Sequence, residues 1–305
     1  MGRRGGRWAS RNAPEDDAPA VSERAVQEYG RAGTRDVNTD ASREKFAQLR
    51  GARRVWAVGA VHGEARRLAR VHDLIGERFF RGDRLVYLGN YLGYGEDVAA
   101  TLDELLDFRR RVLGRPQGFA CDAVYLRGAQ EEMWQKLLQL QFAPNPGEVL
   151  AWMVRAGVEA TVRAYGGDMR QGFAATRDGP RTITRWTSAL RAAMNAAEGH
   201  STLFAALRHA AYTDEAGLLF VHSGIDPRRG LAAQGDAFWW SGTDIVGLNA
   251  PFARFARVIR GFDRDRRGVV EGQFGISVDG GAGRGGRLQA ACFALDGSVV
   301  DFCEA

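Results

Sequence analysis

Cysteine is scarce in this 305-residue sequence: it occurs only at Cys121, Cys292 and Cys303, and no two of these form a C-x-x-C pair. The scarcity argues against a zinc knuckle and a disulfide framework, and it is typical of proteins from a reducing compartment. The sequence also has no run of 18 apolar residues, and no apolar segment follows the twin arginines near its start. We therefore expect a cytoplasmic protein with neither a membrane anchor nor an export signal.

Lysine is almost absent, since it occurs only at Lys45 and Lys136 among 42 basic residues, and the formal net charge is +5. Arginine, alanine and glycine are enriched together, and no repeat of aromatic and basic residues accompanies the charge, so the pattern favours a compositional bias over nucleic-acid binding. A nucleic-acid or scaffold role of the N-terminal segment stays open as an alternative. It predicts salt-sensitive binding that is lost when residues 1–52 are deleted.

The chain divides into a polar N-terminal segment and one domain. Residues 1–52 show almost no apolar periodicity, which predicts a disordered tail. From residue 53 onward, apolar strands alternate with amphipathic helices, and residues from about 145 to 210 are mostly helical before strands return. The pattern predicts an α/β layered domain over residues 53–305 with a helical insertion about 145–210.

Apolar strands end in glycine-rich turns at several points along this domain. These turns read "VGAVHG", "LGNYLGYG", "LRGAQEE", "VHSGIDP" and "VIRGFD". Because loops at the carboxyl ends of strands in an α/β sheet meet at the ligand crevice, we expect the turns to form one site.

The order and spacing of these blocks resemble the calcineurin-like metallophosphoesterases, and most closely the bacterial serine/threonine protein phosphatases of the PPP type. The family signature G-D-x-H-G, G-D-x-x-D-R-G, R-G-N-H-E, V-H-A-G-I and G-H-T is matched here by "GAVHG", "GNYLGYG", "RGAQE", "VHSGI" and "RGFD". The resemblance covers roughly residues 53–303 and implies a four-layer sandwich, two β-sheets flanked by helices, with a helical cap.

In that family two metal ions are held by side chains at six block positions. The resemblance places Ala60, His62, Asn90, Ala129, His222 and Phe262 at those positions, and Gln130 at the position of the histidine that assists the leaving group. Only two ligands are retained, His62 and His222. Two dications about 3.5 to 4 Å apart require anionic ligands, which alanine, asparagine and phenylalanine do not provide. We expect no cofactor, or at most a single weakly bound divalent ion, Zn or Mn, on the two histidines.

The resemblance and the lost ligands together predict a pseudophosphatase that binds a phosphorylated protein or a regulatory partner without hydrolysis, with no catalytic residue expected. Arg127 and Arg260 are candidates for binding phosphate or another anion, although Arg260 would serve equally well as a structural filler of the metal cavity. The composition points to no membrane partner and does not favour nucleic acid. Trp239 and Trp240 are expected in the core.

The alternative is an active phosphoesterase with a remodelled site built from His62, His222 and a nearby carboxylate. The acids in or beside the blocks are Glu131, Glu132, Asp226, Asp263 and Asp265. The resemblance makes Glu131 a structural residue, and the others are consistent with solvated loop acids.

Overall fold

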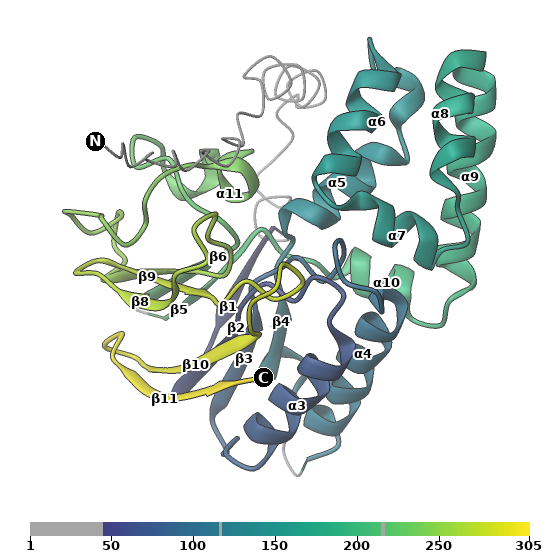
Figure 1. Cartoon of the computed structure of the whole chain (residues 1–305). Helices are drawn as coiled ribbons and strands as arrows, with labels where there is room; N and C mark the ends of the chain where they lie inside the picture. Colours follow the sequence, from purple (N-terminus) through teal and green to yellow (C-terminus); the bar gives the residue numbers. More distant parts are fainter. Residues whose placement is uncertain (1–44, 116–117, 215–216) are drawn as a thin grey trace, which may run out of the picture.

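The computed structural model describes residues 45–115, 118–214 and 217–305, and it forms two β-sheets with helices around them (Figure 1). The five-stranded sheet has the order β11-β10-β2-β3-β4, and the six-stranded sheet has the order β1-β5-β6-β7-β9-β8. Strands β2, β3 and β4 run parallel, as do β6, β7 and β9.

The strands of the five-stranded sheet are β2 (Arg54–Val58), β3 (Asp83–Tyr87), β4 (Ala123–Tyr125), β10 (Gln289–Ala294) and β11 (Val299–Glu304). Those of the second are β1 (Phe46–Leu49), β5 (Ala210–Thr213), β6 (Leu218–Val221), β7 (Arg257–Arg260), β8 (Gly268–Glu271) and β9 (Gly275–Asp279).

One core cluster lies between the two sheets and a larger one lies under the helices, and the side chains of β2 contribute to both. Side chains alternate across a strand, so Val55 and Ala57 point to one face and Trp56 and Val58 to the other. Val55 and Ala57 pack in a cluster that includes Phe220 of the second sheet. Trp56 and Val58 pack instead in a cluster with helix side chains on the outer face. All four β2 residues are fully buried, which explains a continuous apolar strand rather than an alternating one.

Helices cover the outer face of the five-stranded sheet and stand together beside it (Figure 1). The helix α6 and the helix α9 each begin with a proline, a residue that suits the first helical turn because its missing N–H would have no partner there. The helices are α3 (Ala65–Gly76), α4 (Val98–Leu113), α5 (Ala129–Leu137), α6 (Pro146–Arg155), α7 (Val158–Ala164), α8 (Met169–Asp178), α9 (Pro180–Ala196), α10 (His200–Ala205) and α11 (Ala237–Trp240).

The predicted architecture of two sheets flanked by helices is confirmed. Helices α6 to α10 run consecutively between β4 and β5, where the sequence indicated a helical insertion. No helix in the three described ranges is long and apolar enough to cross a membrane.

The domain begins earlier than residue 53, so the boundary predicted at residue 52 is wrong. Strand β1 pairs in parallel with β5, from Phe46 opposite Ala210 to Leu49 opposite Thr213. Leu49 is buried in the core between the sheets. The remainder of the predicted tail, residues 1–44, lies outside the described residues.

Candidate functional site

The glycine-rich turns that follow β2, β3, β6 and β7 lie together, as predicted, and backbone hydrogen bonds join them across the two sheets. The N–H of His62 donates to the carbonyl of Asn90 at 2.6 Å, which joins the first two turns. The N–H of Ala60 donates to Gly261 at 2.9 Å, and the N–H of Phe262 donates to His222 at 2.9 Å. The site is therefore held by main-chain contacts that do not depend on side-chain identity.

Two of these turns hold non-glycine residues in the left-handed region of the backbone map. His62 has φ of 53° and Asn90 has φ of 55°. Such conformations are uncommon outside glycine and cluster at functional sites. The turn geometry of a functional site is thus present even though most of the expected ligands are absent.

Gly89 is required by both conformation and space. Its φ is 92°, and a Cβ atom there would lie 2.7 Å from the backbone N and Cα of Gly128 and 2.9 Å from Nδ1 of His222. We expect Gly89→Ala to lower the free energy of unfolding by at least about 3 kcal/mol, because a left-handed alanine costs about 1 to 2 kcal/mol and the contact with backbone cannot relax cheaply.

Gly166→Ala is the matched control for that substitution, since Gly166 has φ of 73° but nothing within 4 Å of an added Cβ. We expect it to cost about 1 kcal/mol. Urea denaturation of both variants checks the difference. Equal losses would contradict the close approach of the second and third turns.

Glu131 holds the backbone of the second turn by hydrogen bonds, which is the structural role that we expected for it. Its carboxylate is fully buried and accepts hydrogen bonds from the backbone N–H groups of Asn90, Tyr91 and Gly128 at 2.8 Å and of Leu92 at 3.1 Å. Burial raises the pKa of Glu131, and the four donors oppose that rise. The carboxylate is thereby committed to the backbone.

The two retained histidines are fully buried and are neutral above mildly acidic pH. Burial, then the charge of Arg284 and the neighbouring His222, lower the pKa of His62 to about 3. Burial lowers the pKa of His222 to about 4, although its hydrogen bond to Leu88 raises it, and Arg284 lowers it further. Both rings are therefore uncharged imidazoles.

Hydrogen bonds fix which nitrogen of each ring carries the proton. Nδ1 of His222 donates to the carbonyl of Leu88 at 2.7 Å, so Nε2 keeps its lone pair, and that buried atom has no hydrogen-bond partner. Nδ1 of His62 lies 3.3 Å from the carbonyl of Leu92, and Nε2 lies 3.3 Å from Nδ2 of Asn90. The Asn90 amide is oriented by its Oδ1, which accepts from the N–H of Gln130 at 2.9 Å.

The ring of Phe262 packs against both imidazoles. Its ring stacks on His222 at a centroid distance of 5.5 Å and an interplanar angle of 19°, and it meets the ring of His62 edge-on at 6.0 Å. The guanidinium of Arg284 lies 4.7 Å from the Phe262 ring centroid. The Phe262 ring and, behind it, the positively charged Arg284 side chain thus lie beside the histidines.

The arrangement of sheets and turns has a counterpart among solved structures. A "putative diadenosine tetraphosphatase" aligns over 86% of this chain and 98% of its own with a TM-score of 0.51 and 19% identity. The chain has the metallophosphoesterase fold. At this identity the likeness bears on the fold alone. No family model and no curated protein sequence matches the chain.

Two further solved structures align with lower scores. A point mutant of a cold-active protein tyrosine phosphatase gives a TM-score of 0.48 at 13% identity and covers 87% of this chain and 85% of its own. A serine/threonine phosphatase from Saccharomyces cerevisiae, with similarity to human phosphatase PP5, gives 0.43 at 12% identity and covers 93% and 89%.

The residues present do not fit the pair of metal ions that this fold implies. Ala60 and Ala129 offer no ligand, the Asn90 amide is held by Gln130, and the Phe262 ring covers the histidines. Within the described ranges, no group of three or more His, Cys, Asp or Glu side chains could hold a metal ion. The unpartnered Nε2 of His222 offers one lone pair, and a metal site needs several such ligands.

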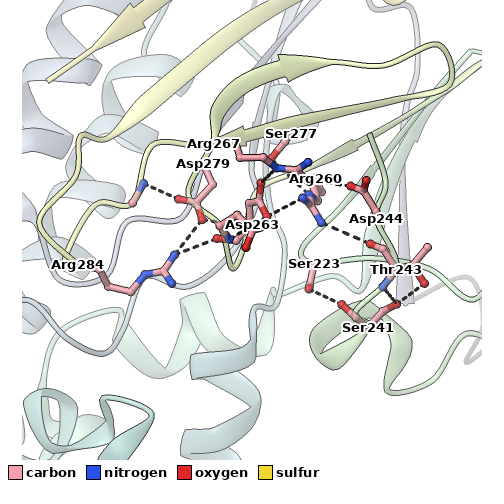
Figure 2. Close-up of polar contacts among 12 residues, drawn as sticks. Ser223, Ser241, Thr243, Asp244, Arg260, Asp263, Arg267, Ser277, Asp279 and Arg284 are labelled. Atoms are coloured by element: carbon pink, nitrogen blue, oxygen red, sulfur yellow. Dashed lines mark hydrogen bonds and ion pairs between the residues drawn. The ribbon is translucent and has the colours of Figure 1, made fainter. Parts of the chain in front are cut away.

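The nearby acids that could have rebuilt a ligand set are engaged elsewhere. Glu132 pairs with Arg127 and Lys136, and Asp226 pairs with Arg229 in an exposed loop. Asp263 is buried between Arg260 and Arg267 at 2.8 and 2.7 Å, and it accepts from the N–H of Asp265 (Figure 2). These contacts explain the direction of the Asp263 pKa: burial alone would raise it, but Arg267, Arg260 and the N–H of Asp265 lower it.

The two arginines expected to bind an anion are placed apart. Arg260 is 5% exposed and lines a cavity of 240 Å³, where it pairs with Asp263 and makes long contacts of 3.4 Å to Ser277 Oγ and 3.5 Å to the Thr243 carbonyl. Arg127 does not line this cavity, and its guanidinium contacts Glu132 and Gln135. These contacts favour the structural role of Arg260 over the alternative, anion binding.

A second cavity, of 160 Å³, opens above the degenerate site and shares Ser223, Phe262 and Arg264 with the first. Trp239 is buried in a core cluster as predicted, Trp240 is partly buried and packs against that cluster, and both also line this cavity. Sequence reasoning missed this role and that of Arg284. The sequence offers one signal for Arg284, a single arginine among the glycines of "GGAGRGG".

Proposed function

We propose that this protein is a pseudophosphatase, a metallophosphoesterase fold that binds a phosphorylated or regulatory protein partner without hydrolysing it. The observation that carries the proposal is the absence, among the described residues, of any cluster of three or more side chains able to hold a metal ion. Supporting it, Phe262 packs against both retained histidines. Hydrolysis by two metal ions needs ligands that offset their mutual repulsion, and neutral imidazoles do not offset it.

The leaving-group position supports the same proposal. The Gln130 amide cannot donate and recover a proton near neutral pH, which general acid catalysis requires. Its Nε2 is also engaged, since it donates to the carbonyl of Ala156 at 2.6 Å. That hydrogen bond links Gln130 to the helical cap, so the Gln130 side chain has a structural role.

The expected result is no release of phosphate from p-nitrophenyl phosphate or from a phosphopeptide in excess Mn²⁺, and no change in melting temperature when Mn²⁺ or a chelator is added. The full chain is assayed beside a His62→Ala, His222→Ala double variant. A Mn²⁺-dependent rate that disappears in the double variant would overturn the proposal. Elemental analysis of the purified protein measures bound metal independently.

The second candidate is an active phosphoesterase with a remodelled, mononuclear site. The unpartnered Nε2 of His222 favours it, because an imidazole lone pair without a partner in the interior is a potential ligand. About one equivalent of bound Zn or Mn, together with the activity described above, is the result that this candidate predicts. An anion contact at Arg127 and Arg260 stays a separate proposal, and both side chains already contact carboxylates.

A further inference from the structure

The cavity above the degenerate site is shaped for one aromatic ring. Its walls include Tyr94, Trp152, Trp240 and Phe262, and the rings of Trp152 and Trp240 meet edge-to-face at 5.8 Å. A cavity of about 150 Å³ with apolar walls accommodates benzene. The 160 Å³ found here is close to that volume, so the cavity has room for a single ring.

The helical cap and the degenerate site both contribute to these walls. Trp152 belongs to α6 of the cap, whereas Phe262 follows β7. Tyr94 joins the two parts, because its N–H donates to the carbonyl of Gly157 at 3.2 Å and its ring meets that of His62 at 5.0 Å. Packing of the helical cap and of the degenerate site thus holds the walls of the cavity in place, so the cavity is preformed.

One arginine lines this cavity, and two others lie close to residues of its wall. Arg264 lines it directly, and the Arg284 guanidinium lies over the Phe262 ring that forms one wall. Arg266 donates to the carbonyl of Arg284 at 2.9 Å, and its charge contributes, after burial, to a lowered pKa of Arg284. The Arg266 side chain is thus anchored on the Arg284 main chain, and guanidinium groups in the same region favour an anion.

The negative charges near the mouth are largely committed to the protein. Asp279 is buried and holds Nη2 of Arg284 at 3.1 Å together with the N–H groups of Asp263 and Gly281 (Figure 2). Arg267 pairs with Asp244 at 2.8 Å and with Asp263. The loops that follow β7 and β9, taken with Asp244 and Asp279, contribute five arginines and four aspartates, a net charge of +1. The Tyr94 hydroxyl is a neutral donor beside Arg284 and Arg266, since burial raises its pKa.

We propose that this cavity and its arginines bind an aryl phosphate, with the ring between Tyr94 and Trp240 and the phosphate against Arg264, Arg266 and Arg284. The inference rests on the proposed function and narrows its ligand to a phosphotyrosine side chain. A phosphoserine side chain would leave the cavity empty, and a cation would meet the positive mouth. Guanidinium groups bind phosphate through paired hydrogen bonds, and the aromatic walls contribute burial of the ring.

The test compares N-acetyl phosphotyrosine amide with N-acetyl phosphoserine amide by titration calorimetry on the full chain, in the presence of a chelator. We expect the phosphotyrosine compound to bind at least about tenfold more tightly, because only it buries a ring. Trp240→Ala widens the cavity and Ala129→Met fills it, so each substitution should remove the preference for the phosphotyrosine compound. Arg266→Met should weaken both compounds alike.

Phe80→Ala is the matched control, since Phe80 is a 63% exposed aromatic residue that lines a different surface cavity. It should leave both affinities unchanged. Equal affinity for the two compounds would overturn the aryl-phosphate inference and leave the proposed function standing. Failure of both compounds to bind would overturn the inference and also a phosphorylated partner for the proposed function.

Discussion

Replacing Glu131 with alanine is expected to lower the free energy of unfolding by at least about 4 kcal/mol. The substitution leaves four buried backbone N–H groups without an acceptor, and each such group costs about 1 to 3 kcal/mol. Losses of this size are exceptional for one residue and mark a broken buried network. Urea denaturation followed by far-ultraviolet circular dichroism measures the change.

Two other substitutions separate this effect from a general loss of charge. Glu131→Gln keeps one acceptor oxygen and should cost about half as much. Glu132→Gln removes the adjacent carboxylate, which pairs with Arg127 and Lys136 near the surface, and should cost about 1 kcal/mol or less. A loss at Glu132 equal to that at Glu131 would contradict the role given to Glu131.

Acidification is expected to destabilise the protein well above the pH at which its carboxylates protonate. His62 and His222 have pKa values of about 3 and about 4 in the folded state, against about 6.5 when unfolded. Between about pH 4 and pH 6.5 the unfolded state therefore binds more protons, and stability is lost as the pH falls through that window. The two groups together account for up to about 5 kcal/mol between pH 6.5 and pH 4.5.

The double variant His62→Gln, His222→Gln isolates this contribution. Burial also lowers the pKa of His72 and of His209, so part of the acid sensitivity should persist in the variant. Melting temperatures across pH 4.5 to 7.5 should show a clearly flatter dependence for the variant than for the natural chain. Parallel curves would mean that the two imidazoles are not held neutral, and the histidine resonances in proton NMR would then titrate near pH 6.

The positions of the turns were predictable because they depend on short-range rules. Glycine at a left-handed position and an apolar strand before it fix where a turn falls, as at Gly89. Since parallel strands bring their carboxyl ends to one edge, the meeting of His62 and Asn90 followed from strand order, whereas His222 comes from the second sheet and its place followed from the family resemblance. The loss of the metal ligands was likewise evident from residue types.

What the sequence did not reveal depends on contacts between distant segments. The aromatic cavity exists because α6 brings Trp152 to within 5.8 Å of the Trp240 ring, 88 positions later in the chain, and neither local pattern indicates that meeting. Arg284 lowers the pKa of both histidines by its charge and packs on Phe262, from a glycine-rich loop without periodicity. An ion pair such as that between Arg260 and Asp263 determines whether an arginine is available to a ligand. The sequence shows the arginine but not its partner.

Strand β1 has a practical consequence for how the protein is handled. It is the outermost strand of the six-stranded sheet and covers one side of β5. A chain shortened to start at residue 53 would uncover the main-chain N–H and C=O groups of Ala210–Thr213, and such uncovered edges recruit strands from other molecules. Shortening the chain to residue 45 keeps β5 paired and Leu49 in the core, so we expect less self-association from that boundary than from one eight residues later.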